Sequence, residues 1–276
     1  MMRRVCLALL PALLGAIYFF GWRTAGLCAW VMLWGCATEY FLARRRGDPL
    51  TESALVTGML LGLSLPPTLP FWMGSVGIVV ALSFGKEFFG GFGRNVFNPA
   101  IVGRAFLYVA FPTAMTRGFV PVYAGGAGGF LHWGPLLSVN GVDAVSAATP
   151  MWALRDFGYA TPFLQLVTGS IHGAFRAADG SARLLAAGSV GEVSAVLVLI
   201  GGIYLLVTKT AQWRLALSCL VGGGVFAALV RYGFGVEAVP PTHWALCSGG
   251  FLYACCFMVT DPISAPNDKT TQLIYG

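Results

Sequence analysis

Long apolar runs dominate this sequence, and each is bounded by a few charged residues or by prolines. They lie at about 5–21, 25–43, 53–65, 69–85, 97–112, 191–207, 212–231 and 243–260. A helix needs about 20 apolar residues to cross roughly 30 Å of hydrocarbon. Only 10% of the chain is charged, whereas a soluble domain carries about 25%. The pattern predicts an all-α polytopic membrane protein with about eight transmembrane elements in a lipid bilayer.

The third run is too short to span a bilayer, and it ends in the stretch "LPPTLP". Proline removes a backbone donor and stops a helix, so we expect a broken or half-penetrating helix there. The eighth run ends in "DPISAP", with two prolines at the same spacing of four residues. Matching third and eighth elements predict an inverted repeat of five-helix units. On that scheme the last two helices of the second unit are missing, because the sequence stops at "QLIYG".

Basic residues in the short loops predict the orientation of the chain. If every run crosses, one side receives Arg23 and Arg231, and the other side receives most of the remaining short-loop charges, from Arg3, Arg4, Arg44, Arg45, Arg46, Lys86, Arg94, Lys209, Arg214 and Lys269. Lys and Arg collect on the cytoplasmic side, so we expect a cytoplasmic N-terminus. The chain then divides into a first membrane half (1–112), an extracytoplasmic loop (113–190) and a second membrane half (191–276).

The sequence argues against several other functions. The net charge of +6 comes from residues that punctuate apolar runs, so it does not indicate nucleic-acid binding. The seven cysteines and three histidines show no metal-ligand spacing, and we predict no resident metal. No nucleotide-binding motif opens a β-α unit, so oxidation of a nucleotide cofactor would belong to another protein.

The segment 85–106, "GKEFFGGFGRNVFNPAIVGRAF", interrupts an apolar region with five glycines and two asparagines, one of them Asn98. Irregular backbone at a membrane boundary is tolerated only where protein buries it or where it lines a wet cavity. The segment could therefore hold a polar ligand, and the alternative is a glycine-rich connecting turn. Arg104 lies within the apolar helix that follows, where a charge is usually functional or paired.

Four acidic residues are weighed separately, and three of them, together with Asn98, are candidates for an ion path or for the surroundings of a flavin. Glu87 and Asp261 lie at the two matching breaks, where an ion or cofactor contact competes with a structural cap. Glu192 lies at a helix start, where capping is the simpler interpretation. We expect Glu39, late in the second run, to extend its carboxylate to the membrane interface.

The stretch "DAVSAATP", residues 143–150, places a threonine before a proline in the predicted outer loop. Proline holds the residue before it extended, and the small side chains around Thr149 leave its hydroxyl open to an enzyme. From the residues alone, an ordinary turn is the more economical interpretation, and a site of covalent attachment is the alternative.

Four stretches together resemble one family, which comprises NqrB of the sodium-translocating NADH:quinone reductase (Nqr) and RnfD of the Rnf electron-transport complex. They are "GKEFFGGFGRNVFNPAIVGRAFLYVAFP", "DAVSAATP", "GSVGEVSAVLVLIGGIYLL" and "FMVTDPISAP", in the family's order. The resemblance implies an inverted repeat similar to that of urea transporters and a location in the bacterial inner membrane. The Rnf and Nqr alternatives both remain open, because different stretches favour each.

The resemblance also implies specific roles for several residues. Asp143, Ser146, Ala148 and Thr149 match the family's pattern for an outer threonine that receives FMN through a phosphoester bond. A separate flavin transferase would attach the FMN, and a second, non-covalent flavin (riboflavin) is expected in NqrB. Glu87 and Asp261 match acidic positions implicated in ion uptake or flavin surroundings.

These implications lead to two hypotheses of different classes. In the first, the chain is a redox subunit that carries covalent FMN in a complex coupled to Na⁺ or H⁺ transport, and it is not catalytic alone. In the second, the same scaffold is a channel or facilitator with an unmodified Thr149. Covalent flavin on the denatured chain discriminates between the two hypotheses.

Overall fold

Two antiparallel helices begin the fold, α1 (Met2–Phe20) and α2 (Trp22–Arg46). The structure is a computed structural model, and it describes residues 1–47, 51–139, 142–143, 147–176, 180, 182–248, 250–266 and 268–276. They meet at Gly21, which has a φ of 92°. A Cβ there would lie 2.7 Å from the carbonyl oxygen of His132, so glycine satisfies both the backbone angle and the close approach.

Three further helices complete the first half of the chain. They are α3 (Ser53–Leu63), α4 (Phe71–Gly85) and α5 (Pro99–Ala110), and the 3₁₀ turn η1 (Glu87–Phe89) follows α4. Helix α2 packs against α3 and α4, and α4 packs against α5. Helix α3 ends within one residue of the proline-rich stretch, as the sequence predicts for a short, broken element.

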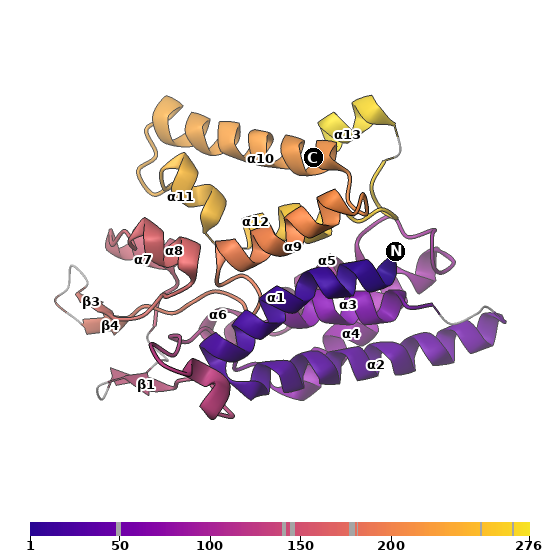
Figure 1. The fold of residues 1–276 in the computed structure, drawn as a ribbon, viewed down its shortest axis with the longest axis horizontal. Coiled ribbons are helices and arrows are strands. Elements are labelled where there is room, and N and C mark those ends of the chain that lie inside the picture. The colour runs from indigo at the N-terminus through magenta and orange to yellow at the C-terminus, as the bar shows by residue number, and fades with distance from the viewer. Residues whose placement is uncertain are drawn as a thin grey trace.

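Short elements follow α5 and gather at one end of the molecule (Figure 1). They are α6 (Pro112–Arg117), η2 (Gly128–Leu131), β1 (Ser138–Val139), β2 (Val142–Asp143), α7 (Pro150–Phe157), α8 (Phe163–Thr168), β3 (Ala174–Arg176) and β4 (Ala182–Leu184). Strands β1 and β2 pair antiparallel, as do β3 and β4, so the all-α expectation misses two small sheets. We call this the hairpin end. The opposite end, where Arg4 donates to the Thr208 carbonyl, is the N-terminal end.

The second half contains α9 (Ala195–Val207) and α10 (Trp213–Ala228), which continues as the π-helical η4 (Leu229–Gly233). It also contains α11 (Thr242–Cys247), α12 (Phe251–Tyr253), the π-helical η5 (Ala254–Met258) and α13 (Lys269–Tyr275). Helix α9 packs against α1 across the middle of the molecule. The eighth predicted run is divided, because Ser248 between α11 and α12 is extended.

The two broken elements, α3 and α12–η5, contact each other, since the Tyr253 hydroxyl donates to the Leu60 carbonyl at 3.2 Å. The loop before α9 covers the end of α3, where Gly191 donates to the Leu63 carbonyl at 2.7 Å. The loop before α5 covers the end of η5, where Asn98 Nδ2 donates to the Met258 carbonyl at 3.4 Å. The last carbonyls of a helix have no partner within the helix, and these contacts satisfy them.

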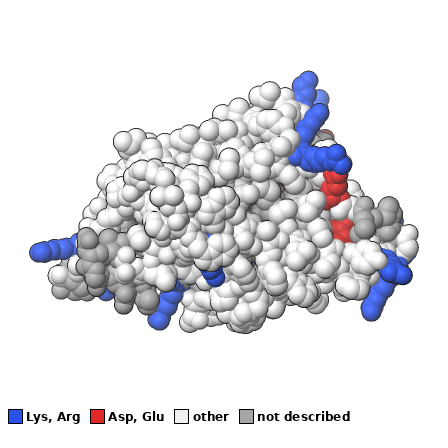
Figure 2. Space-filling view, turned by 60° about the horizontal axis from the view of Figure 1, so that its bottom comes forward, with Lys and Arg blue, Asp and Glu red and all other residues white. Residues whose placement is uncertain are grey.

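Among the described residues, four helices are long and apolar enough to cross a membrane, namely Met2–Phe20, Trp22–Arg46, Phe71–Phe89 and Trp213–Gly233. The shorter apolar helices are Ser53–Leu63, Pro99–Ala110 and Ala195–Val207. In Figure 2, Lys and Arg lie mostly towards the two ends of the face shown, with a broad belt of uncharged side chains between them. These features are those of a multi-pass membrane protein, and eight crossings remain a prediction.

Candidate functional site

Thr149 lies at the hairpin end, directly before the first residue of α7. Its backbone is extended (φ −64°, ψ 157°), and Pro150 occupies the first helical position. The preceding residue, Ala148, is buried and forms a parallel bridge to Leu185, donating to the Leu184 carbonyl at 2.9 Å. The Thr149 hydroxyl makes no capping hydrogen bond to α7, although threonine commonly caps a helix in this position.

Thr149 lines a cavity of about 220 Å³ at this end of the molecule. The other lining residues come from α5, the segment after α6, the first turn of α7, α8 and the segment after it, the loop before α9, and the end of α11 with the break that follows. They include Arg104, Tyr108, Phe119, Met151, Ser189, Glu192, Ser248 and Gly250. Segments far apart in sequence therefore build one chamber around the threonine.

Arg104 and Glu192 form an ion pair on the wall of this cavity. Arg104 Nη1 lies 2.5 Å from Glu192 Oε1, and Arg104 Nη2 donates to the Ser189 hydroxyl at 3.1 Å. The Glu192 side chain is only 3% exposed, whereas that of Arg104 is 23% exposed and also lies over the Tyr108 ring. The charge within the apolar helix is thus paired, and the pair joins the two halves of the chain.

Gly250 provides the space that the Glu192 carboxylate occupies. A Cβ at residue 250 would lie 2.6 Å from Glu192 Oε1. Nearby, the Ser248 hydroxyl lies 3.1 Å from Met151 Sδ, so the first turn of α7 contacts the break in the last apolar run. The irregular backbone at this break forms part of a polar cavity, as expected for non-helical backbone in a membrane protein.

Helix α7 carries its charges on the side that faces away from the molecule. Arg155 Nε donates to Asp156 Oδ1 at 2.6 Å, with the two side chains 66% and 38% exposed. The hydrogen bond from Arg155 lowers the pKa of the Asp156 carboxyl, and a hydrogen bond from Trp152 adds to the effect. The charged face of α7 is therefore paired within itself, and the cavity receives only the first turn of the helix.

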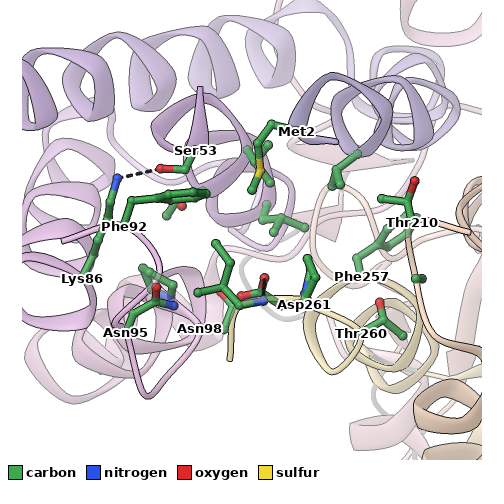
Figure 3. A pocket seen from close by; sticks show the side chains of 18 of the residues that line it. Met2, Ser53, Lys86, Phe92, Asn95, Asn98, Thr210, Phe257, Thr260 and Asp261 are labelled. Atoms are coloured by element: carbon green, nitrogen blue, oxygen red, sulfur yellow. Dashed lines mark hydrogen bonds between the residues drawn. The ribbon is translucent and has the colours of Figure 1, made fainter. Parts of the chain in front are cut away.

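A second, smaller cavity of about 50 Å³ lies at the N-terminal end and is shown in Figure 3. Asn95, Asn98 and Asp261 line it together. Asn98 also caps α5, since its Oδ1 accepts from the Ala100 amide at 3.0 Å. Asp261 accepts from the Ile263 amide and from the Ser264 hydroxyl, both at 3.2 Å. Both predicted residues therefore act as structural caps and also line a cavity.

Two further acidic residues, Glu39 and Glu87, pair with basic side chains, and one of these partners, Lys86, lines the smaller cavity. Glu39 Oε1 lies 2.8 Å from Lys86 Nζ, and both side chains are buried. The expectation that Glu39 extends to the interface is therefore wrong, because Lys86 neutralises its charge inside the protein. Lys86 Nζ also donates to the Ser53 hydroxyl at 2.6 Å (Figure 3). Glu87 pairs with Arg46 and does not line the smaller cavity.

The structure thus separates the predicted residues into two groups. Thr149, Arg104 and Glu192 share the cavity at the hairpin end, while Asn98 and Asp261 share the one at the N-terminal end. Ser146 lies outside the described residues, as does the side chain of Asp143. Within the described ranges, no group of three or more His, Cys, Asp or Glu residues is arranged to hold a metal ion.

Sequence reasoning missed Lys86 as the partner of Glu39 and Gly250 as the space for Glu192. The charged residues of "GKE", directly after an apolar run, indicated that Lys86 needs an acidic partner, but the sequence did not show that this partner is Glu39. Adjacent glycines in "CSGGF" were the signal for the break before α12.

Comparison with known proteins gives matches along the whole chain. The NQR2, RnfD, RnfE family matches residues 1–276. An RnfD protein, from the ion-translocating oxidoreductase complex of Stutzerimonas stutzeri, is 36% identical, with 100% of this chain and 78% of the relative covered. The corresponding protein of the Na⁺-translocating ferredoxin:NAD⁺ oxidoreductase complex from Acetobacterium woodii is 34% identical, covering 100% and 76%. An NqrB protein, from the Na⁺-translocating NADH-quinone reductase of Chromohalobacter salexigens, is 36% identical, covering 86% and 52%.

Proposed function

Because the chain belongs to the NQR2, RnfD, RnfE family, we propose that it is a membrane redox subunit of an ion-translocating electron-transport complex of the Rnf or Nqr type, with FMN bound covalently to Thr149. It would work with the other subunits of that complex and would not be catalytic alone. The observation that carries the proposal is the shared cavity of Thr149, Arg104 and Glu192. We further propose a bacterial inner-membrane location, with the hairpin end extracytoplasmic, and the inverted-repeat scaffold described above.

The local geometry at Thr149 suits a phosphoester. The hydroxyl makes no capping bond, so esterification takes no hydrogen bond from α7. The first N–H groups of a helix have no partner within the helix, and the helix dipole makes this end partly positive. A phosphate attached at Thr149 would lie at the N-terminus of α7, which is a favourable position for an anion.

Arg104 brings a guanidinium to the same cavity, and Glu192 on the same wall balances its charge. Glu192 and Ser189 hold the guanidinium in place, and Arg104 lines the chamber that Thr149 also lines. When bound, FMN supplies one- and two-electron chemistry. The role of the protein is to hold the group, to set the charge beside it and to limit the access of water.

The smaller cavity is our proposed location for a contact of the transported Na⁺ or H⁺. At about 50 Å³ it does not fit the second, non-covalent flavin, riboflavin, because pockets for molecules of that size are about 300–1,000 Å³. The amides there also have partners within the protein, because Asn98 Nδ2 donates to the Met258 carbonyl and Asn95 Nδ2 donates to the Phe97 carbonyl. The described hydrogen-bond partners of Asp261 are neutral groups, whereas Glu87 and Glu192 each face an arginine. Asp261 is therefore the acidic residue best placed to exchange a cation.

The test is in-gel flavin fluorescence of the full chain produced together with a flavin transferase. The wild type should give a fluorescent band after denaturation, and intact-mass analysis should show the chain plus FMN less one water. Thr149→Val removes the hydroxyl with little change in shape and should give a dark band, whereas Thr168→Val, in nearby α8, should stay bright. A dark wild type would favour the channel hypothesis, and a bright Thr149→Val would place the flavin elsewhere.

A further inference from the structure

Several exposed apolar side chains follow one another in the segment 128–137, "GGFLHWGPLL", at the hairpin end. Leu131 and Trp133 are 78% and 65% exposed, and Phe130 and Leu137 are also exposed. No Lys, Arg, Asp or Glu occurs anywhere from residue 118 to residue 142. A contiguous apolar patch of this kind on a protein surface usually marks a contact with another phase or molecule.

Hydrogen bonds fix this segment to the junction between α1 and α2. The Trp22 amide donates to the His132 carbonyl at 3.1 Å, and the Arg23 amide donates to the Trp133 carbonyl at 2.7 Å. These amides belong to the first turn of α2 and have no partner within that helix. The segment therefore caps α2, and it lies at the level where α1 ends and α2 begins.

The segment 128–137 also packs closely against the junction between α1 and α2. A Cβ on Gly129 would lie 2.5 Å from the Gly21 nitrogen, so the backbones of the two segments touch. The Phe130 ring lies 5.9 Å from that of Tyr18 and 6.4 Å from that of Trp22, measured between ring centroids. The indole N–H of Trp22 donates to the Phe130 carbonyl at 2.9 Å. The depth of the segment in the membrane is thus set by the ends of α1 and α2.

The surface of the segment continues the exposed apolar surface of those two helices. Leu14 on α1 and Trp22, Trp30 and Leu33 on α2 are exposed in the same way, and both helices are long and apolar enough to lie in lipid. The second hairpin, β3–β4, differs because it carries Arg176 and Arg183. In Figure 1 it lies farther from the ends of α1 and α2. The uncharged segment 128–137 is therefore expected to contact lipid, and the charged hairpin β3–β4 is expected to lie in water.

We propose that residues 128–137 form a membrane-interface anchor, which inserts Phe130, Leu131 and Trp133 into the lipid leaflet at the hairpin end. Tryptophan is favoured at this depth because its ring combines an apolar body with a polar N–H group. The anchor holds the start of the hairpin-end elements at a fixed height above the bilayer, and it leaves β3–β4 in the aqueous phase. This inference does not depend on whether Thr149 carries a flavin.

The test measures which phase quenches Trp133. The protein, with any subunits that co-purify, is reconstituted in bilayers, and the emission of Trp133 is the difference between wild type and Trp133→Phe. Lipids brominated in the upper part of the acyl chain should remove most of this difference emission, and aqueous iodide should leave it almost unchanged. Quenching by iodide alone would put the segment in water, and quenching by neither would put it under a partner protein; both results overturn the proposal.

A charge in the patch provides an independent check that does not rely on the bromolipids. In Leu131→Asp the carboxylate disfavours insertion, so iodide should quench Trp133 more strongly than in the wild type. Ala182→Asp places the same charge at an exposed position of β4 and should leave the quenching of Trp133 unchanged. An equal response to both substitutions, or to neither, would contradict the anchor.

Discussion

Glu192→Gln should destabilise the fold because it leaves the Arg104 guanidinium without its countercharge. Removal of one partner from a fully buried ion pair costs about 3–5 kcal/mol. Arg104 is 23% exposed and keeps its bond to Ser189, so the cost should be smaller, about 2 kcal/mol. For a chain of this size that loss corresponds to a fall in apparent Tm of about 4–8 °C.

The chain supplies its own reporter for this measurement. Cys28 and Cys255 are free and buried, so a thiol-reactive dye that fluoresces on reaction will follow unfolding during a temperature ramp. The matched control is Glu52→Gln, which breaks the exposed pair between Arg3 and Glu52 and should leave the apparent Tm unchanged.

A double-mutant cycle separates the ion pair from other effects of the substitution. Arg104→Gln combined with Glu192→Gln should cost less than the sum of the two single changes, because neither charge is then left alone. The pair would not stabilise the contact between the two halves if Glu192→Gln left the apparent Tm unchanged, as expected for Glu52→Gln. The same would follow if the losses in stability from the two single substitutions simply added in the double variant.

Three other substitutions test the local geometry with the same thermal assay. Gly250→Ala brings a Cβ to 2.6 Å from Glu192 Oε1 and should cost about 1–3 kcal/mol. In Gly222→Ala the nearest atom to the new Cβ is the Gly276 carbonyl oxygen at 3.9 Å, an ordinary contact, so this change should not destabilise the protein; equal behaviour of the two would contradict the close approach. Asn98→Ala removes the cap of α5 and should cost about 1 kcal/mol, while Asn98→Asp, which keeps the cap acceptor, should cost less. Lys86→Met leaves a buried carboxylate unpaired and should cost about 3–5 kcal/mol, and an unchanged apparent Tm would show that the pair is hydrated.

The sequence predicted the helical elements well because lipid imposes a simple requirement. An apolar run of a given length becomes a helix in a bilayer, since no other structure satisfies the backbone there. For the same reason, prolines after Leu63 correctly predicted the end of α3. Family comparison confirmed the resemblance that the quoted stretches indicate.

The pairing of charges was not predictable from the sequence in the same way. Glu192 reaches an arginine that lies 88 residues earlier in the chain, and Lys86 meets a carboxylate on another helix. A single sequence shows that a buried charge needs a partner, but the partner depends on how the helices pack. The shared cavity of Thr149 and Arg104 therefore required the structure.

Helix α5 contributes to the walls of both cavities. Asn98, at the start of α5, lines the smaller cavity, and Arg104, six positions later, lines the larger one. At 1.5 Å per residue these positions are separated by about 9 Å along the helix axis, which is much less than the roughly 30 Å of a hydrocarbon core. The larger cavity extends inwards because the mid-helix guanidinium and the Glu192 carboxylate form its wall. Less than two turns of one helix therefore separate the residues that α5 contributes to the two cavities.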